Sequence, residues 1–150
     1  MSEKSRELDL VDLEPGDARL VTEALPVLLE LRPHLTPESF TAVYEEGHPQ
    51  GLRFLAAYDG ERCVGVAGWR MIACTSLVRR LYVDDLVTSA AARSGGVGRA
   101  LLAELERRAA EAGSGWLTLD SGVTRFEAHR FYFRERMSAT AHHFTKPVAL

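Results

Sequence analysis

The sequence predicts a mixed α/β fold, in which one central sheet is flanked by helices. Stretches with helical spacing of apolar residues and stretches with strand-like alternation follow one another in the order β-α-α-β-β-β-α-β-α-β. The dipeptide Asp59-Gly60, which is strongly favoured in tight hairpin turns, joins two apolar runs in the middle of this order. The chain has 150 residues, of which 46% are hydrophobic and 26% charged, so we expect a single domain over residues 1–150.

The chain opens with a strand and a helix. Residues 7–13, ELDLVDL, alternate apolar and polar side chains as a half-buried strand does, and EPGD then turns the chain. Apolar residues recur at near-helical spacing over 18–34, although Pro26 interrupts them. We therefore expect a first helix that is kinked, or begins anew, at Pro26.

A second helix is predicted over residues 36–47. Thr36 is a candidate N-cap, Pro37 suits the first helical position, and the stretch ends at Gly47. Ser39 occupies the position that carries Glu or Gln in a capping box, so a full box is not expected.

Three strands and a long helix follow. We predict strands at 52–58 and 62–71, joined by the tight turn, and a further strand at 79–88. The helix predicted at 97–113 ends at Gly113. Its apolar face is made of Val97, Leu101, Leu102, Leu105 and Ala109.

The last predicted elements are a strand, a helix and a strand. GWLTLDS is predicted as a strand over 115–121. A helix over 124–137 follows, with Thr124 as candidate N-cap, and SATAHHFTKPV closes the chain as a strand over 138–148.

Composition excludes several classes of function. The net charge of −3 argues against a general nucleic-acid binder, which usually shows a basic excess. The N-terminus lacks the apolar region of a signal peptide, and no apolar run approaches the ~18 residues that span a bilayer. Cys63 and Cys74 have no neighbours at metal-ligand spacing, so no metal is expected. We expect a soluble cytoplasmic protein without a membrane or nucleic-acid partner.

The stretch ARSGGVGRALL, residues 92–102, is typical of a phosphate-binding turn. It lies between the strand at 79–88 and the helix at 97–113, and arginines stand on either side of its glycines. The first turn of a helix has unpaired N–H groups and a partial positive charge, and glycines let a phosphate approach the backbone. The pattern is neither a Walker A motif nor the dinucleotide motif GxGxxG.

Counted from Arg93, the pattern is Arg-x-x-Gly-x-Gly, with Gly96 and Gly98 in the fixed positions and Gly95 in a free one. It resembles the coenzyme-A motif of the GNAT family of N-acetyltransferases, (Gln/Arg)-x-x-Gly-x-(Gly/Ala), which lies between the family's fourth strand and third helix. The order of predicted elements is also similar to the order in this family.

A second motif strengthens the resemblance. The family carries roughly Ala-x-x-Phe-Tyr-x-x-x-Gly-Phe on a later helix, and this chain has Ala128, Phe131 and Tyr132 at that spacing. The resemblance covers most of residues 7–147 and is strongest over 79–137. It implies a GNAT-like, mostly antiparallel sheet that splays between the fourth and fifth strands.

The resemblance also implies where acetyl-CoA, the acyl donor, binds. Backbone N–H groups from Gly96 to Ala100 would hold the pyrophosphate, with the Arg93 region closing over it. The strand edge near Leu86 to Thr88 would pair with the pantetheine amides. The implied cofactor-binding residues are Leu86, Val87, Thr88, Arg93, Ser94, Gly95, Gly96, Val97, Gly98, Arg99 and Ala100.

Tyr132 matches the tyrosine that the family often uses as a general acid for the leaving thiolate. The alternative is one more aromatic side chain on an apolar helix face. The family's Gly-Phe after the tyrosine is Arg136-Met137 here, so we expect a different helix end or an unfavourable backbone conformation at Arg136. Ser121 lies near the family's usual asparagine position, with a turn role as its alternative.

A general base must remove a proton from the acceptor amine, and family members often carry this base on the fourth strand. That strand holds Asp84 and Asp85, which alternation places on opposite faces. Asp84 is favoured and should share a face with Tyr82 if no bulge intervenes, whereas a local bulge would favour Asp85. Glu45 and Glu46 are further candidates, although a solvated helix end explains them more simply.

The predicted function is direct transfer of the acetyl group from acetyl-CoA to a primary amine of a small molecule. The alternatives are a protein or peptide amine as acceptor, a related acyl donor, and a non-catalytic module that binds CoA. Homodimers are common in such folds, but the sequence shows no interface signature.

Overall fold

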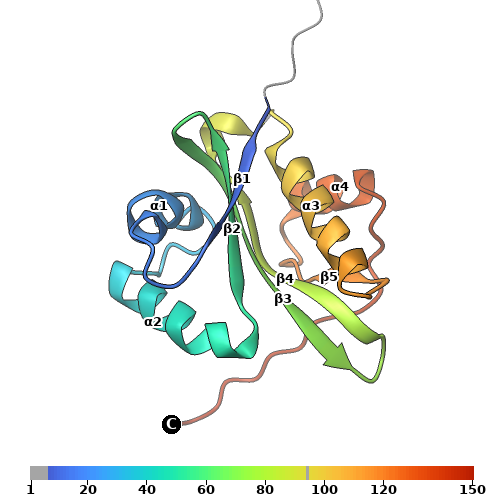
Figure 1. Cartoon of the computed structure of the whole chain (residues 1–150). Helices are drawn as coiled ribbons and strands as arrows, with labels where there is room; N and C mark the ends of the chain where they lie inside the picture. The colour runs from blue at the N-terminus through green and yellow to red at the C-terminus, as the bar shows by residue number, and fades with distance from the viewer. Residues whose placement is uncertain (1–6, 94) are drawn as a thin grey trace, which may run out of the picture. The chain divides into compact units, whose positions relative to one another are not determined.

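A five-stranded sheet with the strand order β1-β2-β3-β4-β5 organises the chain (Figure 1). The computed structural model describes residues 7–93 and 95–150. Two compact units divide the chain, residues 1–118 and 119–150. The mixed α/β class is confirmed, and the single domain over 1–150 stays a prediction.

The first four strands run antiparallel to their neighbours, and β5 runs parallel to β4. The turn at Asp59-Gly60 joins β2 to β3 as predicted, and Gly60 has the positive φ of 63° that tight hairpin turns need. The strand bounds are Asp9–Leu13 for β1, Arg53–Asp59 for β2, Arg62–Cys74 for β3, Val78–Thr88 for β4 and Leu117–Leu119 for β5.

The first predicted helix forms as two short pieces. A π-helical turn covers Leu20–Ala24, and α1 follows at Leu25–Leu28 with Pro26 in its first turn. Proline lacks the N–H that a helix interior uses, and the first turn does not need one, so the helix begins anew here as predicted.

Helix α2 spans Pro37–Gly47 and begins with a full capping box, contrary to prediction. The Thr36 hydroxyl accepts from the Ser39 N–H at 3.0 Å, and the Ser39 hydroxyl accepts from the Thr36 N–H at 2.9 Å. A serine hydroxyl therefore does the work of the usual Glu or Gln side chain, because only an acceptor within reach is required.

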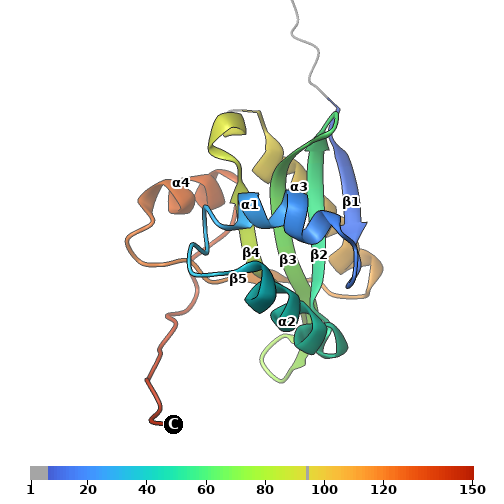
Figure 2. The ribbon, with the colours of Figure 1, turned by 90° about the vertical axis from the view of Figure 1, so that its left-hand side faces the viewer.

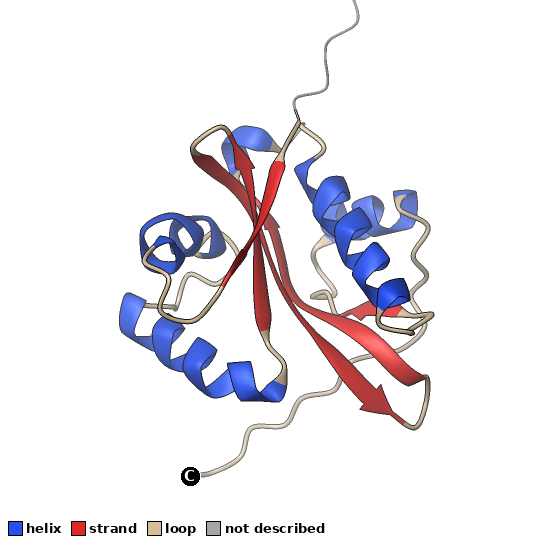
Figure 3. Ribbon diagram, viewed as in Figure 1, coloured by secondary structure: helices blue, strands red, loops and turns tan. Residues whose placement is uncertain are grey.

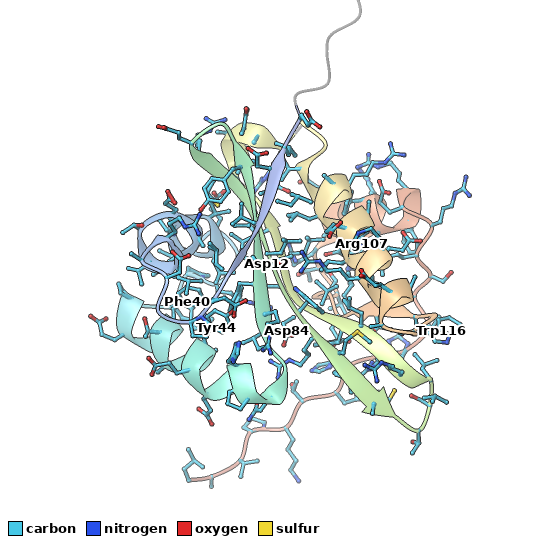
Figure 4. The ribbon with its side chains drawn as sticks, viewed as in Figure 1. Asp12, Phe40, Tyr44, Asp84, Arg107 and Trp116 are labelled. Atoms are coloured by element: carbon cyan, nitrogen blue, oxygen red, sulfur yellow. The ribbon has the colours of Figure 1, made fainter. Side chains whose placement is uncertain are left out.

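Helices α1 and α2 lie on one face of the first four strands and α3 (Val97–Glu111) lies on the other (Figures 2 and 3). Phe40 and Tyr44 extend from α2 toward the sheet (Figure 4), where both pack edge-on against Phe54 of β2. All five residues of the predicted apolar face of α3 are buried. Gly113 ends that helix with φ 79°, as predicted.

The second unit contains α4 (Phe126–Arg134), whose N-cap is Arg125 rather than the predicted Thr124. The predicted strand over 138–148 is not formed, so the last β in the expected element order is wrong. Alternation makes a segment suited to a strand, but a strand also needs a neighbouring strand for its backbone hydrogen bonds. Phe144 in this segment is 90% exposed.

Candidate active site

The N-terminus of α3 is open to an anion. Gly96 is the N-cap in a left-handed conformation with φ 74°, no side chain of the described residues caps the helix, and the first turn carries no acidic residue. The Ala100 N–H donates to the Gly96 carbonyl at 3.0 Å as the first bond of the helix. The N–H groups of Val97 and Gly98, which precede Ala100 in the helix, are therefore placed to meet a ligand.

The glycines of this turn serve different purposes. A Cβ on Gly96 would meet nothing within 4 Å, so glycine is needed there for the positive φ alone. A Cβ on Gly95 would lie 3.3 Å from the Ala92 carbonyl oxygen, which accepts from the Gly95 N–H at 3.0 Å. Ser94, also predicted to contact the cofactor, lies outside the described residues.

The turn is anchored by Glu30, which the sequence did not point to. Its carboxylate accepts from the Ala90 N–H at 2.9 Å and lies 3.9 Å from the Arg93 guanidinium. The Arg93 side chain is 63% exposed, so it can move onto a bound phosphate. Glu30 thus links the segment after α1 to the turn before α3.

Residues 86–88 of β4 pair with residues 65–67 of β3 on one side. On the other side, β5 has three residues, and the segment leading into it meets β4 at Leu81, whose N–H donates to the Trp116 carbonyl at 2.9 Å. That contact lies toward the start of β4, away from the predicted pantetheine edge. The pairing of residues 86–88 with pantetheine and the splay between β4 and β5 both stay predictions.

A β-bulge places both aspartates of β4 on one face of the sheet. Gly68 of β3 pairs with Asp85 whereas Trp69 pairs with Val83, so Asp84 is an extra residue without its own partner. The predicted opposite faces are therefore wrong: strict alternation fails where one strand has an added residue. Both carboxylates lie on the face that packs against α1 and α2.

Each aspartate is paired with an arginine. Arg70 of β3 holds Asp84 through two hydrogen bonds of 3.0 Å, and Arg32, after α1, donates to Asp85 at 2.8 Å. Arg32 also donates to the Asp84 carbonyl at 3.1 Å. Tyr82 pairs with Arg70 across the strands, so it shares the face of Asp84 even though the bulge lies between them, a case that the prediction did not cover.

Burial distinguishes the two carboxylates. It raises the pKa of Asp85 above the usual carboxyl value, although Arg32 opposes the shift. A carboxylate with a raised pKa is a better proton acceptor, and a bulge in β4 is the case in which the sequence favours Asp85.

Sequence reasoning does not find Arg32 and Arg70. They lie 53 and 14 positions from the aspartates that they bind, and only the folded chain brings them into contact.

Tyr132 lies on α4 in the second unit. Burial raises the pKa of its phenol, which keeps the proton in place, and Arg125 opposes the shift. Arg136 has φ 65°, the unfavourable backbone conformation expected where the family has glycine.

The weaker candidates gain little support. Glu45 and Glu46 are exposed on α2. The Ser121 hydroxyl is buried without a hydrogen-bond partner among the described residues.

Within the described part of the chain, no group of His, Cys, Asp and Glu side chains could hold a metal ion, and no helix is long and apolar enough to cross a membrane.

The sheet order, and a helix opened by Gly96 as the next α-helix after β4, are the arrangement that the resemblance to the GNAT family predicts. A family model described as "Acetyltransferase (GNAT) family" matches residues 19–137. The chain belongs to this family and is an N-acetyltransferase that takes its acyl group from acetyl-CoA.

One protein is similar to this chain in sequence, and two solved structures are similar to it in fold. The Bacillus subtilis (strain 168) protein YhdJ, named as an uncharacterized N-acetyltransferase, is 33% identical over 129 residues, 84% of this chain and 90% of its own. The solved aminoglycoside N-acetyltransferase AAC(6')-Iy, in complex with CoA, superposes with a TM-score of 0.82 at 13% identity and covers 100% of both chains. A ribosomal-protein-alanine N-acetyltransferase from Brucella melitensis gives a TM-score of 0.72 at 19% identity, covering 95% of this chain and 99% of its own.

Proposed function

We propose that this enzyme transfers the acetyl group of acetyl-CoA directly to a primary amine of a small molecule. The observation that carries the proposal is the bulge on β4. It brings two carboxylates to one face of β4, which leads through a short 3-10 helix at Ala90–Ala92 into the glycine turn of α3. A proton acceptor and an anion-binding turn thus lie on consecutive stretches of the first unit.

The donor is held by its phosphates and its amides. The pyrophosphate accepts from the N–H groups of Val97 and Gly98, with Arg93 and Arg99 adding positive charge. The pantetheine arm pairs with β4 at Leu86–Thr88 as an added strand. This arrangement leaves Asp84 and Asp85 further back along the same strand.

The chemistry needs one base and one acid. Asp85 takes a proton from the acceptor ammonium, and the amine lone pair then forms the C–N bond at the thioester carbonyl. The C–S bond breaks, and the CoA thiolate takes the proton of the Tyr132 phenol. The nitrogen loses its surplus proton as the amide forms, and that proton restores the phenol. Neither cysteine is used: the Cys63 thiol has its pKa raised by burial, and Cys74 lies near the tip of the β3–β4 hairpin.

Two observations bear on the acceptor. AAC(6')-Iy is named for acting on aminoglycosides, which are small-molecule amines, and this supports a small acceptor. The Brucella melitensis neighbour is named for acting on a ribosomal protein, so a peptide amine is the second candidate.

Because acetyl-CoA is made inside the cell, we expect the reaction in the cytoplasm.

The test is thiol release from acetyl-CoA in the presence of small amines and of peptides. We expect Tyr132→Phe to lower kcat by about 100-fold or more while acetyl-CoA still binds, because only the proton donor is lost. Unchanged turnover would remove Tyr132 from the mechanism, and no thiol release with any amine would favour a non-catalytic CoA-binding module.

The donor site is tested separately by calorimetry. Gly98→Asp places a carboxylate in the first turn of α3 and should abolish acetyl-CoA binding while the protein stays folded. The matched control is Ala103→Asp, which adds the same charge at an exposed position further along α3 and should leave affinity unchanged. Equal affinities for the two variants would contradict the pyrophosphate site.

A further inference from the structure

The sheet face that carries the two aspartates also carries a surplus of positive charge. Across β3 and β4, Arg70 pairs with Tyr82 and Ile72 pairs with Arg80, so these side chains share the face of Asp84 and Asp85. From these contacts we infer that the acceptor carries an anionic group, a carboxylate, as well as its amine. The inference rests on the proposed function and names the substrate class of that site.

Arg80 is the residue that points to an anion. Its Nε is buried and has no hydrogen-bond partner in the part of the chain that the structure describes, while one terminal nitrogen makes a long contact of 3.4 Å to the Thr118 hydroxyl. Its guanidinium lies 5.3 Å from the centre of the Tyr82 ring, which holds it against the strand. A buried guanidinium N–H without an acceptor is costly, and a carboxylate from a ligand would satisfy it.

The neighbouring charges do not supply that carboxylate. Asp84 is held by both of its oxygens on Arg70, and Asp85 is held by Arg32. Among these five described residues, three arginines thus face two aspartates, and Arg80 is the arginine that neither aspartate binds. A polycationic aminoglycoside would meet this excess unfavourably, whereas a molecule with one amine and one carboxylate would balance it.

The spacing sets the shape of the acceptor. Strand residues rise about 3.3 Å each, so Arg80 and Asp85 are separated by about 13 Å along β4 once the bulge is allowed for. An arginine side chain shortens this gap but does not close it. The amine and the carboxylate of the acceptor are therefore several bonds apart, as in an ω-amino acid, rather than on one carbon.

The experiment compares 6-aminohexanoate with hexylamine, which has the same amine and chain length but no carboxylate. Thiol release should give a kcat/KM at least tenfold higher for 6-aminohexanoate. Arg80→Gln should remove this preference by lowering kcat/KM for 6-aminohexanoate toward the value for hexylamine. Arg79→Gln is the matched control, because Arg79 is the adjacent strand residue, is exposed and faces the other side, and it should keep the preference.

The outcomes separate this inference from the proposed function. Equal kcat/KM values for the two amines, or a preference that survives in Arg80→Gln, would overturn the inference while the acetyltransferase proposal stands. If no amine supports thiol release, the proposed function fails first. Calorimetry with 6-aminohexanoate then decides: binding that is lost in a folded Arg80→Gln supports the anion site, and no binding by the natural chain overturns it.

Discussion

Arg136 holds a backbone conformation that suits glycine. Its φ of 65° follows the last turn of α4, where the Met137 N–H donates to the Tyr132 carbonyl at 3.0 Å and closes the helix. A side chain with a Cβ is strained in this region by about 1 kcal/mol or more.

We therefore expect Arg136→Gly to raise the free energy of unfolding by about 1 kcal/mol, measured by urea denaturation. Arg136→Ala keeps the Cβ and serves as the control, with no such gain expected. A variant with glycine that is less stable than the alanine variant would contradict the strain.

The two aspartates make a matched pair for locating the base. Asp85→Asn should lower kcat by about 100-fold or more, because it removes the proton acceptor without changing the shape of the side chain. Asp84→Asn should cost less than about tenfold, since this carboxylate is already held by Arg70. The larger loss in Asp84→Asn would reassign the base.

The pH dependence of kcat/KM is a second test of Asp85 as the general base. A general base works only when ionised, so kcat/KM should fall as the pH drops through the Asp85 pKa. Burial raises that pKa, which moves the fall to higher pH than for an ordinary carboxyl group. The same limb should be absent from the residual activity of Asp85→Asn.

At the scale of whole elements, two glycines of β3 fix how closely its neighbours approach. A Cβ on Gly68 would lie 2.8 Å from the Asp85 carboxylate and 2.9 Å from the Phe54 ring. A Cβ on Gly65 would lie 2.6 Å from the Val97 side chain, at the start of α3. Gly68 thus leaves room for the proposed base, and Gly65 lets the start of α3, where we propose that the donor binds, pack closely on β3.

The two alanine variants should therefore separate the two halves of the reaction. Gly68→Ala displaces Asp85 and should lower kcat with little change in the affinity for acetyl-CoA. Gly65→Ala pushes on α3 and should weaken acetyl-CoA binding by about tenfold or more. Calorimetry and steady-state kinetics check both, and identical profiles for the two variants would refute the division.

At the scale of the whole molecule, acetyl-CoA should stabilise the folded chain. A ligand that binds only the native state at 100 times its Kd adds about 2.7 kcal/mol, which raises Tm by about 5 to 10 °C for a chain of this size. CoA without the acetyl group should give a similar rise, because the proposed contacts are to its phosphates and amides. Gly98→Asp should show no rise with either ligand in a thermal-shift measurement.

The sequence by itself determined the local elements. Helical spacing predicted the buried face of α3 from Val97 to Ala109, and Asp59-Gly60 predicted the hairpin. The glycine pattern predicted the turn at which we propose that the donor binds. These features depend on residues a few positions apart, for which backbone conformation and periodicity are sufficient. The expected final strand failed for the opposite reason, because pairing requires a partner that the segment itself does not supply.

Only the tertiary structure decided the faces and partners of the charged residues. The bulge at Asp84 depends on the register between β3 and β4, and one added residue reverses every later side chain. The pairs of Arg32 with Asp85 and of Glu30 with the donor turn join segments more than 50 positions apart, which no local pattern records. The motifs of the sequence thus indicate the acyl donor, whereas the charged face from which we infer the acceptor forms only when the chain folds.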